Sequence, residues 1–198
     1  MLARYDRPVQ SRRPLLVVVS GAPGAGKTIL ASRLSIDLSL PLLAKDELKE
    51  AIGEELGPPR DVGESQRIGR AAYSLLFGLV GRLLEAGFGA ILESNFRRGL
   101  SERHLAPLVA SADARVIHCT AEPALLQSRY EERFARRERH AVHRDDERAA
   151  ALAEELRAGR YEPLELGVPT LVVDTCNGLE PPYESLLAFV RAATVEHR

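Results

Sequence analysis

The feature that most constrains this fold is a glycine-rich stretch, GAPGAGKT at residues 21–28, which directly follows the apolar run LLVVV at residues 15–19. The pattern of Gly, four residues and then Gly-Lys-Thr is specific when a strand precedes it and a helix follows it. The glycines let the backbone curl so that successive N–H groups point at one spot, and the following helix adds its positive N-terminal end. This part of the chain therefore predicts a buried strand, a loop that binds phosphate groups, and a helix.

The end of this loop indicates which ligand it holds. Lys27 can reach the β- and γ-phosphates of a nucleoside triphosphate, and the hydroxyl of Thr28 can bind Mg²⁺. We therefore expect the loop to bind ATP together with Mg²⁺. The predicted nucleotide-binding residues of this stretch are Gly21, Ala22, Pro23, Gly24, Ala25, Gly26, Lys27, Thr28 and Ile29.

Five apolar runs recur along the chain, and a helical pattern follows each of them. Several have few polar interruptions, which is typical of parallel strands covered on both faces. Strands that alternate with helices form a parallel sheet with right-handed crossovers and helices on both sides, an α/β fold in three layers. The predicted strands are residues 15–20, 40–44, 87–93, 114–119 and 170–174, and the predicted helices are residues 27–38, 46–52, 68–84, 102–110, 123–135 and 182–193.

Two carboxylates follow the second and third predicted strands. Ligands of such folds bind at the carboxyl ends of the strands, so both side chains should lie near the phosphates. Asp46 either accepts the proton of a phosphate acceptor or caps the helix that begins there, and the sequence leaves both roles open. Glu93 stands where a ligand of Mg²⁺ or of its bound water is needed.

The composition restricts the class of protein. With 198 residues, 28% charged and 45% hydrophobic, the chain is long enough for one sizeable globular domain, which we expect to span residues 1–198. The net charge of −1 supplies no overall field that would attract a nucleic acid, and no apolar run has the length of a membrane helix. Residues 1–13 are basic and lack a signal-peptide pattern, so we expect a flexible tail. Cys119 and Cys176 show no metal or disulfide spacing, which favours the reducing cytoplasm.

Residues 133–148 do not fit the alternation of strands and helices. They read RFARRERHAVHRDDER, with almost no apolar content, so we expect them to lie outside the core. Taken alone, the segment is typical of a solvated helical face with local ion pairs. His140 and His143 lie in it without a third soft ligand nearby, so a zinc site is not expected.

Together these motifs resemble the P-loop kinases related to polynucleotide kinase, zeta toxin and chloramphenicol phosphotransferase, which are AAA domain-containing ATP-binding proteins. KDELK at residues 45–49 is similar to their basic-Asp-acidic-x-basic segment, and ESN at residues 93–95 is similar to their Asp-Thr-Asn segment. Three later stretches resemble the helix before their lid, the lid itself and the strand that borders the base. They are TAEPALLQSRYEER at residues 120–133, RHAVHRD at residues 139–145, and VVDT at residues 172–175. The resemblance runs from about residue 15 to about residue 190.

The resemblance implies a P-loop NTPase fold with a five-stranded parallel sheet in the order 2-3-1-4-5 and an arginine-rich lid at residues 133–148. It implies Asp46 as the general base for the acceptor hydroxyl. Glutamate is one methylene longer than the family's aspartate, so a water-bridged contact of Glu93 with Mg²⁺ is expected. The further implied roles are catalytic for Lys27, Arg133 and Arg137, nucleotide-binding for Arg129 and Thr175, and metal-binding for Thr28 and Glu93.

The phosphate acceptor should lie between Asp46 and the helix at residues 68–84, roofed by residues 57–64. A groove for a nucleic-acid strand usually needs basic residues with stacking aromatics, and this chain has no Trp and 5% aromatic residues. We therefore favour a small molecule of the sugar, antibiotic or nucleoside type. A 5′-hydroxyl polynucleotide kinase and an ATP-binding regulatory module are the alternatives. Candidate acceptor-binding residues are Lys49, Arg70, Asn95, Arg97 and His140, with Arg60, Gln66, Arg67 and Tyr73 as further contacts.

Overall fold

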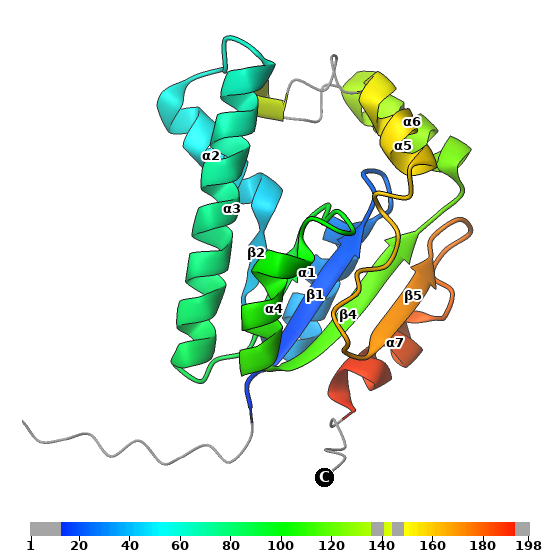
Figure 1. Ribbon diagram of the computed structural model, residues 1–198. Helices are drawn as coiled ribbons and strands as arrows, with labels where there is room; N and C mark the ends of the chain where they lie inside the picture. The colour runs from blue at the N-terminus through cyan, green and yellow to red at the C-terminus, as the bar shows by residue number, and fades with distance from the viewer. Residues whose placement is uncertain (1–12, 136–140, 144–148, 193–198) are drawn as a thin grey trace, which may run out of the picture.

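The computed structural model describes residues 13–135, 141–143 and 149–192. Its centre is a five-stranded sheet in the order β2-β3-β1-β4-β5, in which all neighbouring strands are parallel (Figure 1). The strands are β1 (Leu15–Gly21), β2 (Leu42–Ala44), β3 (Ala90–Glu93), β4 (Asp113–Thr120) and β5 (Thr170–Asp174). The sheet and its strand order confirm the predicted α/β fold.

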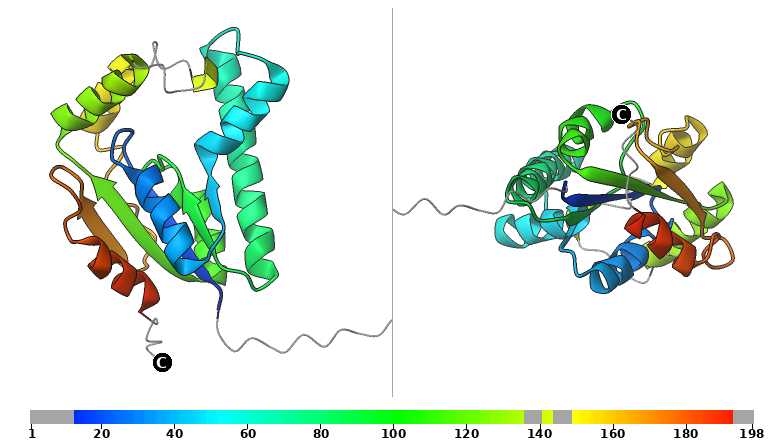
Figure 2. Two further views of the ribbon diagram at one scale, coloured as in Figure 1. Left: turned by 180° about the vertical axis from the view of Figure 1, so that it is seen from behind. Right: turned by 90° about the horizontal axis from the view of Figure 1, so that it is seen from below.

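Helices cover both faces of the sheet and give the molecule three layers (Figure 2). Val17 and Val19 of β1 pack with α1 and α7, whereas Leu16 and Val18 pack with α3 and α4. Both sets are fully buried, which explains why β1 reads as an unbroken apolar run. The helices are α1 (Lys27–Leu38), α2 (Lys45–Leu56), α3 (Val62–Glu85), α4 (Glu102–Ser111), α5 (Pro123–Ala135), α6 (Ala149–Arg157) and α7 (Tyr183–Arg191), with a short 3₁₀ turn, η1 (Ala141–His143).

The long helix α3 begins at Val62 rather than at residue 68, because a capping arrangement precedes it. The carboxylate of Asp61 accepts a hydrogen bond from the backbone N–H of Glu64 at 2.8 Å, and the carboxylate of Glu64 accepts one from the N–H of Arg60 at 2.7 Å. These bonds satisfy N–H groups that have no partner within the helix. The added turns carry α3 beyond the sheet beside α2, so that the two helices form a wall above the strand ends (Figure 1).

Strands β2 and β3 are shorter than predicted, because turns take up the residues before them. Gly87 has a left-handed φ of 83°, and its N–H donates to the carbonyl oxygen of Leu84 at 2.9 Å. The N–H of Phe88 likewise donates to the carbonyl oxygen of Leu83 at 2.9 Å. Gly87 therefore ends α3 instead of beginning β3, as is common for glycine after a helix.

The charged segment at residues 133–148 contains two buried residues, contrary to the expectation that it lies wholly outside the core. Val142 and His143 of η1 are 0% and 1% exposed. One apolar side chain and one hydrogen-bonded ring are enough to seat a short turn, and a count of apolar residues over the segment does not detect them. Residues 136–140 and 144–148 lie outside the described residues, so the predicted lid stays a prediction there. Helix α6, which follows, was not predicted.

Two further observations concern the cysteines and the lengths of the helices. Both cysteines are free, with Cys119 buried and Cys176 half-buried. Within the described ranges, every helix is too short or too polar to cross a membrane.

Candidate active site

The loop between β1 and α1 requires glycine at two positions, because other parts of the chain approach it closely. Gly21 and Gly24 have φ values of 138° and 88°, a region that residues with a side chain rarely adopt. A Cβ atom at Gly24 would lie 2.7 Å from the carbonyl oxygen of Leu126, and one at Gly21 would overlap the carbonyl oxygen of Cys119. The loop is therefore held against β4 and α5, with its backbone available to a ligand.

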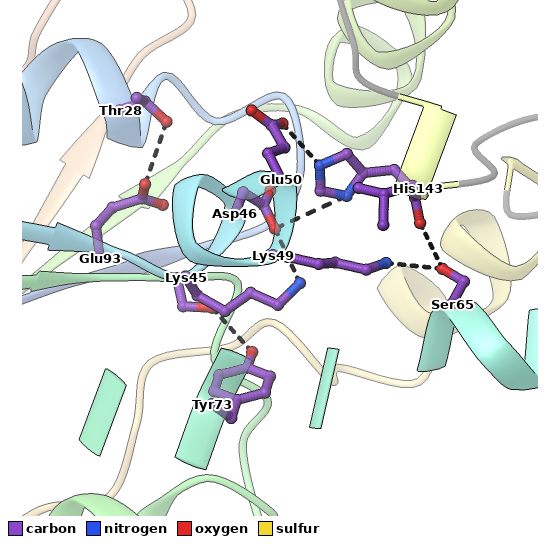
Figure 3. A network of polar contacts seen from close by, with 11 residues as sticks. Thr28, Lys45, Asp46, Lys49, Glu50, Ser65, Tyr73, Glu93 and His143 are labelled. Atoms are coloured by element: carbon purple, nitrogen blue, oxygen red, sulfur yellow. Dashed lines mark hydrogen bonds and ion pairs between the residues drawn. The ribbon is translucent and has the colours of Figure 1, made fainter. Parts of the chain in front are cut away.

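Lys27, Thr28 and Glu93 meet at the start of α1. The Lys27 side chain is buried, and its Nζ donates to the carbonyl oxygen of Ala22 at 2.8 Å. The Thr28 hydroxyl donates to Oε2 of Glu93 at 3.2 Å (Figure 3). Burial lowers the pKa of Lys27 and raises the pKa of Glu93, and the attraction between the two groups opposes both shifts. The site thus holds a buried amine beside a buried carboxyl group.

A cavity of about 540 Å³ lies above the loop, where the strands end. Lys27 and Asp46 follow β1 and β2, Glu93 is the last residue of β3, and all three line this cavity. The volume is in the range of small-molecule and cofactor sites. The predicted site residues that line it are Pro23, Gly24, Gly26, Lys27, Thr28, Ile29, Asp46, Glu93, Asn95, Arg129, Arg133 and Thr175.

The oxygen atoms at the start of α1 suit Mg²⁺. The Thr28 hydroxyl and the Glu93 carboxylate are hard oxygen ligands, and they already lie side by side at 3.2 Å. Among the residues that the structure describes, no three His, Cys, Asp or Glu side chains gather in a way that could hold a metal ion. Magnesium commonly takes one or two protein ligands and completes its shell with water and substrate phosphates. These two residues therefore fit a Mg²⁺ ion that binds together with a triphosphate.

Asp46 lies in the first turn of α2 and is half-buried at the cavity wall. The helix begins at Lys45 and its N-cap residue is Ala44, so Asp46 does not occupy the capping position that the sequence left open. Nζ of Lys45 donates to Oδ1 of Asp46 at 2.9 Å. Nδ1 of His143 approaches the same oxygen at 4.0 Å (Figure 3). The carboxylate therefore borders the cavity with a cation and an imidazole ring beside it.

Glu50 and Ser65 join this network, and the sequence analysis identified neither of them. Nε2 of His143 lies 2.8 Å from Oε1 of Glu50. The Ser65 hydroxyl, on α3, donates to the carbonyl oxygen of Val142 at 2.7 Å (Figure 3). The four-residue spacing of Asp46 and Glu50 was the available signal, because it places both carboxylates on one face of a helix. No sequence pattern indicated Ser65.

Arg129 of α5 ties the phosphate loop to the end of β5. Its Nη1 donates to the carbonyl oxygen of Gly24 at 3.3 Å and to Oγ1 of Thr175 at 3.1 Å, and its Nη2 donates to the carbonyl oxygen of Thr175 at 2.7 Å. Arg133 lines the cavity one helical turn later, and its charge adds to burial in lowering the pKa of Lys27. The cavity thus receives positive charge from α5 as well as from the loop.

Of the predicted acceptor-binding residues that the structure describes, seven do not line this cavity: Lys49, Arg60, Gln66, Arg67, Arg70, Tyr73 and Arg97. Lys49 is 2% exposed, and its Nζ donates to a serine hydroxyl of α3 at 2.7 Å. Arg97 forms an ion pair with a glutamate of α6 at 2.6 Å, and Arg70 is exposed on α3. Two more predicted residues, Arg137 and His140, lie outside the described residues. Roles for these nine residues in catalysis or acceptor binding stay predictions.

Other residues line the cavity without having been identified from the sequence. Arg33 follows Ile29 by one turn of α1, so helical spacing could have indicated it. Gly178 and Leu179 belong to the connection after β5, where no motif marks them. The additional lining residues are Leu30, Arg33, Glu132, Gly178 and Leu179.

Comparisons with known proteins agree with this geometry. A family model described as an AAA domain matches residues 16–158. Among solved structures, a candidate kinase from Chloroflexus aurantiacus is 35% identical, with a TM-score of 0.80 over 91% of this chain and 98% of that chain. No curated protein matches the chain.

Two more distant structures share the fold. A gluconokinase from Sinorhizobium meliloti is 16% identical, with a TM-score of 0.54 over 90% of this chain and 93% of that chain. A sugar kinase from Janibacter sp. is 18% identical, with a TM-score of 0.53 over 88% and 91%. At these identities the likeness concerns the arrangement of strands and helices.

Proposed function

Because the chain belongs to the AAA domain family and has the fold of P-loop kinases, we propose that it transfers the γ-phosphoryl group of Mg·ATP to a hydroxyl group of a small molecule. The observation that carries this proposal is the position of Asp46. A carboxylate that borders the same cavity as the phosphate loop is suited to accept the proton of an attacking hydroxyl. A protein that only bound ATP would have no need for a base there.

Mg·ATP would supply the phosphoryl group and part of the charge stabilisation. The backbone amides of the loop and Lys27 would hold the phosphates, and Thr28 with Glu93 would hold the metal ion. Arg133 would offset negative charge that develops on the transferred group. Asp46 would accept the proton of the acceptor hydroxyl, with Lys45 beside it to balance the charge of the carboxylate.

A hydroxylated small molecule is the proposed acceptor. The chain lacks Trp and has few aromatic residues on which the bases of a nucleic-acid strand could stack. Two fold neighbours are described as a gluconokinase and a sugar kinase, so sugars and sugar acids belong first in a search for the acceptor. A cytoplasmic location is part of the same proposal.

The test is an ADP-release assay with Mg·ATP and a panel of acceptors. The panel contains sugars, sugar acids, aminoglycosides, nucleosides and 5′-hydroxyl oligonucleotides. Asp46→Asn should retain ATP binding and lose transfer by about 10²- to 10⁴-fold. Glu54→Gln, an exposed carboxylate on the same helix, is the matched control and should have wild-type activity.

The outcomes separate the alternatives. Stimulation by oligonucleotides alone would identify a polynucleotide kinase. Tight ATP binding without stimulation by any acceptor would favour a regulatory module. Equal loss of ATP binding and transfer in Asp46→Asn would mean that the residue supports the structure rather than the reaction.

A further inference from the structure

The described part of the charged segment, η1, is fixed against α2 and α3. Val142 and His143 are 0% and 1% exposed. The Ser65 hydroxyl donates to the carbonyl oxygen of Val142 at 2.7 Å and accepts from Nζ of Lys49 at 2.7 Å. Ser65 and Lys49 are themselves 4% and 2% exposed, so these bonds are shielded from water. A turn held in this way gives the His143 ring a defined position.

That position places the imidazole ring between two carboxylates of α2 (Figure 3). Nε2 of His143 lies 2.8 Å from Oε1 of Glu50, and Nδ1 lies 4.0 Å from Oδ1 of Asp46. An ionised carboxylate can only accept a hydrogen bond, so Nε2 carries the hydrogen in the contact with Glu50. In the neutral ring, Nδ1 then has a lone pair on the side of Asp46.

A proton on Nδ1 would be stabilised by its surroundings. Asp46 and Glu50 lie one helical turn apart on the same face, and like charges repel at this spacing. An imidazolium ion between them attracts both carboxylates. Lys45 also contacts Asp46, but an ammonium group has no lone pair and cannot accept a proton. His143 is therefore suited to receive a proton from Asp46.

We propose that His143 is a positioning residue that takes up the proton collected by Asp46 during phosphoryl transfer, an inference that rests on the proposed function. The acceptor oxygen forms a bond to the γ-phosphorus, the bond from that phosphorus to the bridging oxygen breaks, and ADP keeps the electron pair. The acceptor proton passes to the Asp46 carboxylate and then to Nδ1 of His143, which restores the ionised carboxylate. After product release the imidazolium ion returns the proton to the Asp46 carboxylate, which borders the cavity and passes it to water.

The separation of 4.0 Å between Nδ1 and Oδ1 is longer than a hydrogen bond. Rotation of the two side chains or one bridging water closes this gap. Glu50 keeps the ring in the required tautomer throughout, because its carboxylate holds the hydrogen on Nε2.

The kinetic test uses His143→Gln with the acceptor that gives the highest ADP release. Glutamine can still donate to Glu50 but offers no basic nitrogen to Asp46. The value of kcat should fall at least about tenfold, while KM for ATP stays unchanged. Added imidazole should partly restore kcat in His143→Ala.

His104→Gln, which replaces an exposed histidine on α4, is the control and should behave as wild type. An unchanged kcat in His143→Gln would overturn the inference. A fall in kcat matched by an equal rise in KM for ATP, with no rescue of His143→Ala by imidazole, would also overturn it.

A second readout does not depend on activity. In ¹⁵N NMR spectra of the neutral ring, Nδ1 of His143 should be the unprotonated nitrogen. Asp46→Asn should shift this resonance, whereas Glu184→Gln, an exposed carboxylate on α7, should not. A hydrogen on Nδ1 would overturn the inference, as would an Nδ1 resonance that does not shift in Asp46→Asn. A wild-type protein with the predicted tautomer and no transfer activity would overturn the proposed function, but not this placement of the ring.

Discussion

Replacement of Lys27 by methionine separates the binding role of this residue from its part in the fold. The side chain is 6% exposed, and its Nζ donates to the carbonyl oxygen of Ala22. Methionine has a similar length and fills a similar volume, but it has neither the charge nor the donor. The variant should therefore fold, and Mg·ATP should stabilise it much less than it stabilises the wild-type protein.

The expected change without nucleotide is small. Loss of the hydrogen bond to Ala22 costs about 1 kcal/mol. Burial disfavours the charged form of Lys27, so removal of the charge offsets part of this cost. Loss of the amine also raises the pKa of Glu93 further, because Lys27 is the nearby cation that favours its ionised form. We expect the free energy of unfolding to change by less than about 2 kcal/mol.

The expected change with nucleotide is large. Mg·ATP at a hundred times its Kd stabilises the wild-type protein by about 2.7 kcal/mol. For a chain of this size each kcal/mol raises Tm by about 2–4 °C, so Tm should rise by about 5–11 °C. If Lys27→Met weakens binding about a hundredfold, the same concentration stabilises the variant by only about 0.4 kcal/mol, or about 1–2 °C.

The assay is thermal unfolding followed by circular dichroism, since the chain has no Trp for fluorescence. Lys49→Met is the matched control, because Lys49 is equally buried and does not line the cavity. The control should keep the full rise in Tm with Mg·ATP. A full rise in Lys27→Met, or the same loss in Lys49→Met, would refute the assignment of the loop.

Three further substitutions have defined outcomes. Gly24→Ala places a Cβ atom 2.7 Å from the carbonyl oxygen of Leu126 at a residue with a φ of 88°. The substitution should lower the free energy of unfolding in urea by about 1–3 kcal/mol and weaken ATP binding. Wild-type stability together with wild-type ATP affinity would contradict this geometry. Asp61→Ala removes the acceptor of the Glu64 N–H and should lower the free energy of unfolding by about 1 kcal/mol. An unchanged free energy of unfolding would show that the cap contributes nothing. Burial, and to a lesser degree the charge of a nearby lysine, lowers the pKa of His118 from 6.5 to about 4, so between these values the unfolded state binds a proton that the folded state does not. The stability present above pH 6.5 is therefore lost as the pH falls, by about 2 kcal/mol between about pH 7 and about pH 5. His118→Leu should remove that part of the acid sensitivity. If the free energy of unfolding falls equally steeply with pH in the wild-type protein and the variant, the lowered pKa is contradicted.

The sheet could be predicted from the sequence because each strand is short, apolar and covered on both faces. The loop at residues 21–28 then indicated where the candidate site lies, since the motif needs a strand and a helix around it. Turn residues were harder to assign. Gly87 was predicted both to follow the end of the helix at residues 68–84 and to begin the next strand, and only the first of these predictions is confirmed. The start of α3 was predicted six residues late, because the capping pattern of Asp61 and Glu64 was not recognised in the sequence.

The surroundings of the acceptor side could not be predicted, because they depend on contacts between residues far apart in the sequence. His143 contacts Glu50 only because η1 returns to α2, and one buried valine seats that turn. Arg97 looked available at the rim, but it pairs with Glu155 of α6, a helix that the sequence pattern did not indicate. Side chains of this kind acquire their roles from the tertiary structure.

The most direct test of phosphoryl transfer is a crystal structure of the protein with Mg·ADP and aluminium fluoride, which mimics a phosphoryl group between donor and acceptor. The distance to measure joins the Asp46 carboxylate to the oxygen that lies opposite the leaving group, whether it belongs to water or to an acceptor. We predict a hydrogen bond of about 2.6–3.2 Å. A distance of more than about 6 Å, too long even for one bridging water, would contradict the assignment of Asp46 as the base.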